Sequence, residues 1–181
     1  MKSAGIVRRI DDLGRVVIPK EIRRRLKIRE GDPLEVYTEK DGEVVLRKYS
    51  PLGEMKYFVK QYVEALAAEV GHLVCITDRD EVVAASGSNS KDFVGRIITR
   101  ELEDVIDKRR MFVRTSNEAK FVNIIEGQNG YYSEIIGPII SEGDVVGAVI
   151  ILGKDEDKIL GDIEIKLVNC AVSFLGKQFE T

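Results

Sequence analysis

The sequence contains no tryptophan, one histidine, two cysteines and four prolines among its 181 residues. The single histidine, His72, has no serine or cysteine partner at a spacing typical of nucleophilic catalysis. Cys75 and Cys170 lie far apart inside apolar stretches, so a disulfide framework or a zinc site is excluded, and we interpret both as reduced core residues. The low proline content, with 44% hydrophobic residues, excludes a disordered or low-complexity chain.

Long hydrophobic runs are also missing. The longest apolar runs, such as 145–152, fall far short of the roughly 20 residues that a membrane-spanning helix needs. The N-terminus has no apolar signal-peptide core, and the chain has no glycine-rich phosphate-binding loop. These absences predict a cytoplasmic protein that has no membrane partner, binds no cofactor and is not an enzyme.

Charge is distributed unevenly along the chain. The net charge is −3, but residues 1–53 carry 13 Lys and Arg against 9 Asp and Glu, a net charge of +4. Residues 54–181 carry 15 basic and 22 acidic residues, a net charge of −7. A basic N-terminal part on an acidic body indicates that the N-terminal part meets a polyanion, although a solvated basic surface without a partner is the alternative.

The N-terminal part has the pattern of a small mixed domain. Apolar alternation and turn signals predict strands at 6–10 and 15–18, a helix at 20–28, and strands at 34–38 and 43–48. Pro19 suits the first turn of the helix, and Asp41-Gly42 is typical of a hairpin. A domain of about 50 residues is marginal for one hydrophobic core. We therefore expect residues 1–53 to fold as a dimer.

Basic residues gather on one side of the predicted helix. The spacing i, i+3, i+4, i+7 places four cations on one stripe: Lys20, Arg23, Arg24 and Lys27. Such a stripe is self-repulsive, and we interpret it as a phosphate-contacting face rather than a solvated one. The first hairpin adds Arg8, Arg9 and Arg15, whose planar guanidinium groups suit phosphate oxygens and guanine edges.

Residues 54–181 predict a second domain. The pattern indicates a leading helix at 54–70, strands near 72–77, 82–85, 112–113, 121–125, 131–140 and 145–152, and helices at 91–110 and 160–179. The apolar stripe of helix 54–70 packs on its own domain, pairs across a dimer, or does both. Ile163, Leu167, Cys170 and Phe174 share one face of the last helix. The expected fold is an α+β domain with an antiparallel sheet flanked by helices.

Acidic residues at the turn 78–81 leave one further alternative open. Asp78, Asp80 and Glu81 offer carboxylates of the kind that bind a cation, but acids in a hairpin turn are usually solvated. We therefore predict no metal site and no catalytic residue.

The N-terminal motifs carry a resemblance to a known family. Asp-Leu-Gly-Arg-Val-Val-Ile-Pro at 12–19, followed by Glu-Ile-Arg-Arg at 21–24, closely resembles the AbrB-type DNA-binding domain. The resemblance implies that two chains exchange hairpins to form one dimeric swapped-hairpin β-barrel. It also implies that arginines meet duplex DNA; the matching residues are Arg8, Arg15, Arg23 and Arg24, and Lys20 is added from the helix stripe.

The C-terminal part resembles a GAF-like domain through the hairpin formed by 135–139 and 143–150. An AbrB-type domain followed by a GAF-like domain is similar to sporulation regulators of endospore-forming bacteria. GAF domains commonly hold a small molecule, but this chain has neither a cysteine placed for a bilin nor the Asn-Lys-x-Phe-Asp-Glu motif. Sensing of an unknown effector and a role as dimerisation scaffold both remain open.

We therefore predict a DNA-binding transcription regulator with domains at 1–53 and 54–181, associated with the nucleoid. Dimers through the N-terminal domain and association of the second domain would form a homotetramer. One alternative is an antitoxin-like DNA-binding protein whose main partner is another protein, although the folded second domain argues against it. The other alternative is a sensor or enzyme whose basic N-terminal part binds an acidic protein or RNA.

Overall fold

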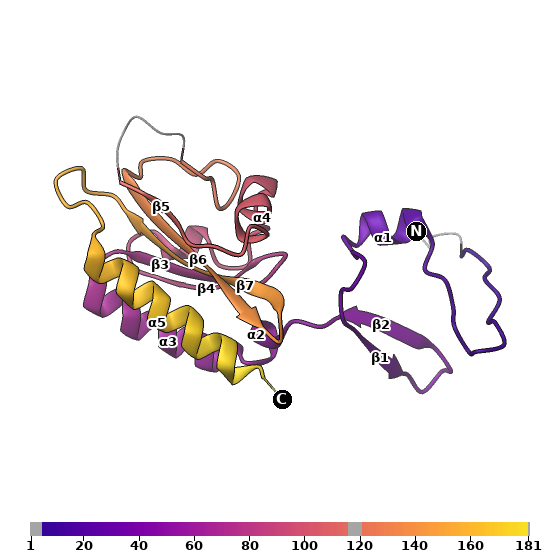
Figure 1. Cartoon of the computed structure of the whole chain (residues 1–181). Coiled ribbons are helices and arrows are strands. Elements are labelled where there is room, and N and C mark those ends of the chain that lie inside the picture. Colours follow the sequence, from indigo (N-terminus) through magenta and orange to yellow (C-terminus); the bar gives the residue numbers. More distant parts are fainter. Residues whose placement is uncertain (1–4, 116–120, 181) are drawn as a thin grey trace. The chain divides into compact units, whose positions relative to one another are not determined.

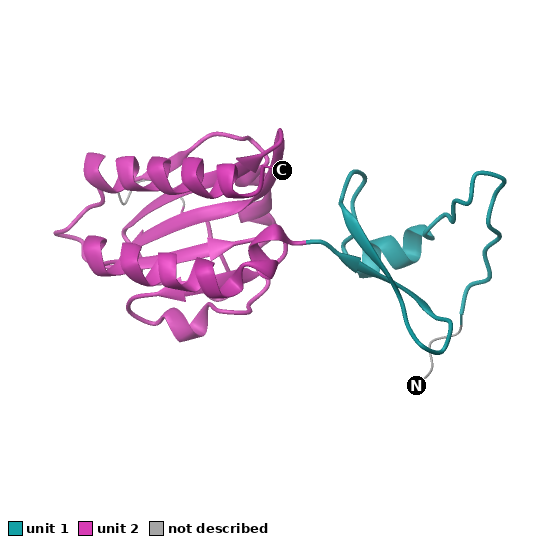
Figure 2. Cartoon of the chain, turned by 90° about the horizontal axis from the view of Figure 1, so that it is seen from below, with its two compact units in different colours: residues 1–49 teal, residues 50–181 magenta. Residues whose placement is uncertain are grey.

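The computed structural model describes residues 5–115 and 121–180. The chain divides into two compact units, residues 1–49 and residues 50–181 (Figure 2). We call them the N-terminal unit and the C-terminal unit and describe each by itself.

The N-terminal unit contains one short helix and one antiparallel hairpin (Figure 1). Helix α1 spans Lys20–Arg25, strand β1 spans Leu34–Thr38, and strand β2 spans Val44–Lys48. The register pairs Leu34 with Lys48 and Thr38 with Val44. The hairpin therefore forms where the Asp-Gly signal predicts it, with Gly42 at a φ of +79° in the turn.

The strands expected at 6–10 and 15–18 are absent from the single chain. Residues 5–19 contain no strand, and a turn closed by the bond from the Asp11 amide to the Arg15 carbonyl (3.1 Å) stands between the two segments. Among residues 5–49, the sheet contains β1 and β2. A strand needs a neighbour that accepts its ladder of hydrogen bonds, and these segments have no such neighbour in the described part of one chain.

Helix α1 ends three residues earlier than expected. Lys27 adopts a left-handed φ of +53°, and the Ile28 amide donates to the Arg23 carbonyl at 2.8 Å while the Lys27 amide donates to the Arg24 carbonyl at 3.3 Å. This pair of bonds is a Schellman motif, which ends a helix. Lys27 therefore leaves the helix, and the expected four-residue basic stripe is wrong at that position.

The N-terminal unit has almost no buried side chains. Among residues 5–49, Pro19 alone is buried. The apolar residues of the expected strands and of the helix are exposed instead, and they include Val7, Ile10, Val16, Val17, Leu26, Val36 and Val44. The core face expected at Ile22 and Leu26 is thus not buried within one chain.

The C-terminal unit is built on a five-stranded antiparallel sheet of order β4-β3-β7-β6-β5 (Figure 1). The strands are β3 (Leu73–Thr77), β4 (Val82–Ser86), β5 (Phe112–Arg114), β6 (Ser133–Ser141) and β7 (Asp144–Gly153). The central hairpin β6–β7 joins the two long apolar runs of the sequence. Burial on both faces explains why these runs are nearly continuous.

Helices cover one face of this sheet and loops with a short helix cover the other (Figures 1 and 2). The first face carries α3 (Lys56–Val70) and α5 (Asp162–Gln178), preceded by the short α2 (Pro51–Glu54). The second face carries α4 (Arg100–Ile106) and the 3-10 turn η1 (Ser90–Asp92). Each side has its own hydrophobic cluster, so the sheet is sandwiched between two cores.

The helix expected at 91–110 is mostly a loop. Gly95 has a φ of +76°, and Ile97 and Ile98 form isolated bridges to Glu81 and Ile125. Helix α4 begins only after Thr99, whose hydroxyl accepts the Leu102 amide at 3.2 Å. The strand expected at 121–125 is reduced to the bridge at Ile125. Pairing of Ile97 and Ile98 with residues distant in the sequence therefore overrides the helical periodicity here.

The last helix buries a different face from the expected one. Val168, Ala171 and Leu175 are buried against the sheet, whereas Ile163 is 71% exposed and Phe174 39% exposed. Cys170 is exposed as well. The interpretation of Cys170 as a core residue is therefore wrong, while Cys75 is fully buried and burial raises the pKa of its thiol.

Candidate nucleic-acid interface

Helix α1 presents three of the expected DNA-binding residues. Lys20, Arg23 and Arg24 stand at i, i+3 and i+4 of the same short helix, and all three are exposed. The Pro19 carbonyl accepts the Arg23 amide at 2.9 Å, so Pro19 is the N-cap residue of α1, where its missing N–H costs no helical hydrogen bond. These three cations therefore share one side of α1, without Lys27.

Arg23 is further restrained by its own chain. Its Nε donates to the Ile18 carbonyl at 3.2 Å, which ties the guanidinium to the segment before the helix. Arg8 is exposed in the extended segment before the turn, and no hydrogen bond or ion pair to another described residue restrains it. The structure thus gathers the three helix residues on α1, and Arg8 belongs to no helix or strand.

Arg15 lies at the end of a tightly bonded turn. The Asp11 carboxylate accepts the Leu13 amide at 3.0 Å and the Arg15 amide at 2.8 Å through Oδ1. Through Oδ2 it also accepts Arg15 Nε at 2.8 Å, an ion pair in which the Arg15 side chain stays 70% exposed. Hydrogen bonds from the Arg15 amide and from its side chain lower the pKa of Asp11. Gly14, at a φ of +76°, allows the chain to close this turn.

The sequence pattern places Asp11 only between the two expected strands at 6–10 and 15–18. A local signal was nevertheless present, because an aspartate that bonds backbone amides two to four residues ahead forms an Asx turn. The arginine at i+4 then falls within reach of the second carboxylate oxygen.

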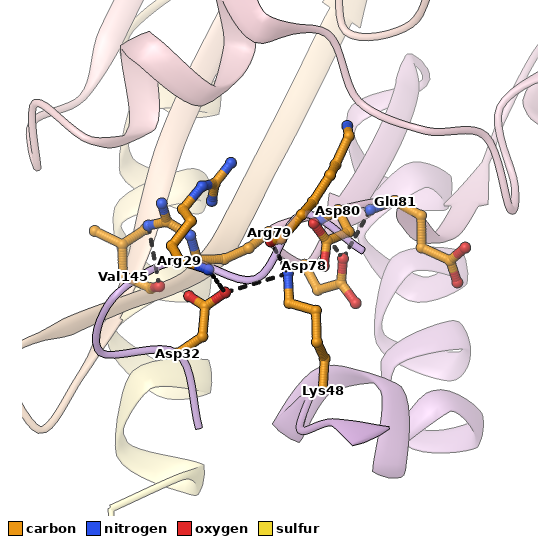
Figure 3. Close-up of polar contacts among 9 residues, drawn as sticks. Arg29, Asp32, Lys48, Asp78, Arg79, Asp80, Glu81 and Val145 are labelled. Atoms are coloured by element: carbon orange, nitrogen blue, oxygen red, sulfur yellow. Dashed lines mark hydrogen bonds and ion pairs between the residues drawn. The ribbon is translucent and has the colours of Figure 1, made fainter. Parts of the chain in front are cut away.

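Other basic residues of the N-terminal unit hold the unit together (Figure 3). Asp32 Oδ2 accepts the Arg29 amide at 2.8 Å and pairs with Lys48 Nζ at 3.4 Å. Lys48 Nζ also donates to the Lys27 carbonyl at 3.0 Å, which joins β2 to the end of α1. Lys48 is therefore a structural cation, in contrast to the exposed ones on α1.

The acidic turn of the C-terminal unit is occupied by internal hydrogen bonds (Figure 3). Asp78 Oδ1 accepts the Asp80 and Glu81 amides, each at 2.8 Å, and Asp78 Oδ2 accepts the Ser50 hydroxyl at 2.8 Å. Among the described residues, no group of three His, Cys, Asp or Glu side chains is arranged to hold a metal ion. Asp78 thus closes the β3–β4 turn and anchors Ser50, the first residue of this unit.

A buried carboxyl group lies on the loop-covered face of the sheet. Glu134 on β6 is fully buried and stands opposite Arg114 of β5. Its Oε1 accepts the Val122 amide at 2.8 Å, whereas Oε2 has no partner in the described part of the chain. Burial raises the pKa of Glu134 to about 7.

No described helix is long and apolar enough to cross a membrane.

Comparison with known proteins settles the family. Residues 54–180 match the model of the family described as "Stage V sporulation protein T C-terminal, transcription factor". Over 181 residues, the sequence is 49% identical to Stage V sporulation protein T of Bacillus subtilis strain 168, covering 99% of both chains. The chain belongs to the SpoVT family. Its members are transcription factors, so the expectations of a transcription regulator and of a non-enzymatic protein are confirmed.

The N-terminal part has relatives of its own. Residues 7–53 match the family described as "Antidote-toxin recognition MazE, bacterial antitoxin". The sequence is also 59% identical over 51 residues to the transition state regulatory protein AbrB of the same organism, covering 28% of this chain and 52% of that protein. The AbrB-type assignment is confirmed. The antitoxin match covers only the N-terminal part, whereas the SpoVT relative matches the whole chain.

The C-terminal unit has the GAF fold. It is similar to the GAF domain region of a membrane protein from Geobacter sulfurreducens, with a TM-score of 0.55 at 14% identity over 68% of this chain and 91% of that one. A free methionine-R-sulfoxide reductase from Thermoplasma acidophilum has a TM-score of 0.52 at 12% identity, over 68% and 93% of the two chains. These similarities concern the fold alone, and they confirm the GAF-like assignment of this SpoVT family member.

Proposed function

We propose that this SpoVT family member regulates sporulation genes by binding duplex DNA as a dimer through a DNA-binding domain at residues 1–53, which contains the N-terminal unit. Residues 54–181 join two such dimers into a homotetramer. The observation that supports a dimer is that the N-terminal unit lacks a hydrophobic core: among residues 5–49, Pro19 alone is buried.

A second copy of the chain would account both for the segments that form no strand and for the exposed apolar residues of that unit. A second copy supplies the missing neighbours for the segments 6–10 and 15–18 and covers side chains such as Val7, which is 91% exposed, and Val17, which is 73% exposed. Burying these side chains on both copies gains about 1.5–3 kcal/mol for each large apolar residue. The swapped-hairpin barrel implied by the AbrB resemblance has this property.

DNA contact follows from the exposed cations of the dimer. Arg8, Arg15, Arg23, Arg24 and Lys20 are all exposed and would occur twice around the two-fold axis. Phosphate contacts supply the salt-dependent part of affinity, and arginine forks reading base edges supply the preference for sequence.

Association of the C-terminal units is supported by an aromatic cluster on the helical face. The rings of Phe58 and Tyr62 on α3 lie 6.1 Å and 5.7 Å from the ring of Phe174 on α5. Phe174 is 39% exposed, and Ile163 on the same helix is 71% exposed. An apolar stripe that does not face its own sheet favours packing against a second copy.

A fluorescence-anisotropy titration of duplex DNA by the full-length protein at several salt concentrations tests DNA binding. Contact with six to ten phosphates predicts a log–log slope of about −5 to −9. Failure to bind near physiological salt would contradict the proposal. Analytical ultracentrifugation on the same sample tests the assembly, and a monomer at micromolar concentration would contradict the shared core.

A further inference from the structure

The contact between Asp11 and Arg15 includes more hydrogen bonds than a simple surface ion pair. One carboxylate accepts three hydrogen bonds, two from the Leu13 and Arg15 amides through Oδ1 and one from Arg15 Nε through Oδ2. The turn around it is closed twice more, by the Asp11 amide on the Arg15 carbonyl and by the Gly14 amide on the Asp11 carbonyl at 3.0 Å. The backbone that carries Arg15 and the base of its guanidinium are therefore held by the same group.

This arrangement selects how the guanidinium is presented. With Nε occupied by Asp11, the side-on edge formed by Nε and one terminal nitrogen is no longer available. Nη1 and Nη2 have no hydrogen-bond partner among the described residues, and the Arg15 side chain is 70% exposed. The end-on pair of donors remains, which matches two neighbouring acceptors such as O6 and N7 of guanine.

The charge of the pair argues against a phosphate contact. Asp11 neutralises Arg15 locally, and the hydrogen bonds that lower the pKa of Asp11 keep it ionised. A neutralised arginine releases few counterions, and the nearby carboxylate repels the DNA backbone. Lys20 and Arg24 on α1 have no such acidic partner in the described part of the chain. Arg15 is thus less suited to general affinity than to directional recognition.

We propose that Asp11 is a positioning residue that presents the terminal nitrogens of Arg15 to a guanine edge and so sets the sequence preference of DNA binding, at a cost in general affinity. The inference rests on the proposed DNA-binding function and deepens it. It assigns selectivity to Asp11, which does not itself touch the DNA.

The neighbouring Asp12 provides a matched control. It is exposed on the same turn and has the same charge, but it has no hydrogen bond or ion pair with the described residues. Asp11→Asn keeps an oxygen that accepts the backbone amides and removes the charged partner of Arg15 Nε. Asp12→Asn removes the same charge without removing any contact, so the two variants differ only in the restraint on Arg15.

The test compares two duplexes of equal length and composition with the full-length protein. One duplex is enriched by the wild-type protein from a random-sequence pool, and the other is its shuffled version. We expect Asp11→Asn to lower the ratio of the affinity for the enriched duplex to that for the shuffled duplex by about three- to tenfold. This loss is smaller than the loss expected from removing a whole bidentate contact. Asp12→Asn should keep the wild-type ratio, and both variants should bind the shuffled duplex slightly more tightly.

A double-mutant cycle with Arg15→Ala shows whether Asp11 acts through Arg15. If it does, Asp11→Asn changes the ratio in the wild-type background and leaves it unchanged in the Arg15→Ala background. Equal ratios for Asp11→Asn and Asp12→Asn would overturn the proposal, and so would an equal loss of both duplexes by Asp11→Asn. Salt-dependent binding of the wild type would survive either result, so failure of this inference is distinguishable from failure of the DNA-binding function.

Discussion

The Val122 amide donates a hydrogen bond of 2.8 Å to Oε1 of the buried Glu134, and this bond fastens the segment after residue 120 to strand β6. The other carboxyl oxygen has no partner among the described residues. Glu134 is faced by Arg114 from β5, which favours its charged form, and by Glu101 from α4, which disfavours it. Desolvation dominates, so the group holds its proton to a higher pH than an exposed glutamate.

This burial predicts a pH-dependent stability. The pKa of Glu134 is about 7 in the folded chain, against 4.5 for the free side chain. Between these values the folded state binds more protons than the unfolded state, so the free energy of unfolding falls as pH rises through this window. The loss is complete above about pH 7 and amounts to about 1–3 kcal/mol.

Urea unfolding of Glu134→Gln between acidic and mildly alkaline pH checks this prediction. The amide still accepts the Val122 N–H bond and carries no charge, so the variant should lose this part of the pH dependence and exceed the wild type at alkaline pH. Glu126→Gln, at an exposed position, is the matched control. Parallel pH profiles of wild type and Glu134→Gln would contradict the assignment.

Single arginines of the N-terminal unit that contact bases should dominate affinity for the preferred duplex. Arg15→Ala or Arg23→Ala should weaken binding by about 1–3 kcal/mol, because each removes a restrained guanidinium fork. Lys20→Ala should cost less and reduce the salt slope by about 1. Anisotropy titration measures both effects. Lys60→Ala is the control, since Lys60 lies on α3 of the C-terminal unit; wild-type affinity in both folded arginine variants would remove them from the interface.

The outward face of the C-terminal helices should control the tetramer. Phe174→Ser removes the exposed ring that stacks on Tyr62, so we expect tetramers to dissociate into dimers at higher protein concentration. Val94→Ala removes an apolar side chain of similar exposure, 43%, from a loop of the same unit and should leave the assembly unchanged. Sedimentation velocity over a dilution series measures the difference; identical profiles for the two variants would place the interface elsewhere.

The left-handed residue at the end of α1 offers a stability test. Lys27 has a φ of +53°, where a side chain is strained and glycine is not. Lys27→Gly should raise the free energy of unfolding by about 0.5–1 kcal/mol. Lys27→Ala removes the same charge but keeps the strain, so it should not stabilise. Chemical denaturation distinguishes them, and equal stability of the two variants would contradict a strained helix end.

A change at the junction between the two units tests whether the proposed tetramer contributes to DNA binding. Ser50 both accepts the Gly53 amide at 3.0 Å and donates to Asp78, so the chain enters the C-terminal unit at a fixed place. We expect a flexible Gly-Ser insert after Tyr49 to leave the tetramer intact and to weaken binding to long duplexes several-fold, because it lowers the effective concentration of the second dimer. Unchanged binding to long duplexes by such a variant would contradict a contribution of the second dimer to affinity.

Much of the fold was predictable where local signals agree with the tertiary environment. The hairpin β1–β2 follows its Asp-Gly turn, and the hairpin β6–β7 follows two apolar runs around a polar turn at 141–144. The motif at 12–24 identified the AbrB-type domain, and its cations are exposed as expected. Turn chemistry and burial on both faces act over a few residues, so the sequence expresses them directly.

Local hydrophobic periodicity did not predict the structure where contacts with residues distant in the sequence determine it. Residues 91–98 have helical spacing, yet Ile97 and Ile98 form bridges to Glu81 and Ile125. Helix α5 has two apolar stripes, and periodicity alone does not say that Val168 and Leu175, rather than Ile163 and Phe174, face the sheet. Segments 6–10 and 15–18 look like strands but have no neighbour within one chain.

The sequence by itself determined the family, the two-unit organisation of charge and the set of cations available for DNA. Only the tertiary structure decided which helix face is buried, where α1 ends, and that Asp11 holds Arg15 while Glu134 is sealed beneath a loop. The physical reason is that side-chain type is a local property, whereas burial and hydrogen-bond partnership depend on what the folded chain brings alongside each residue.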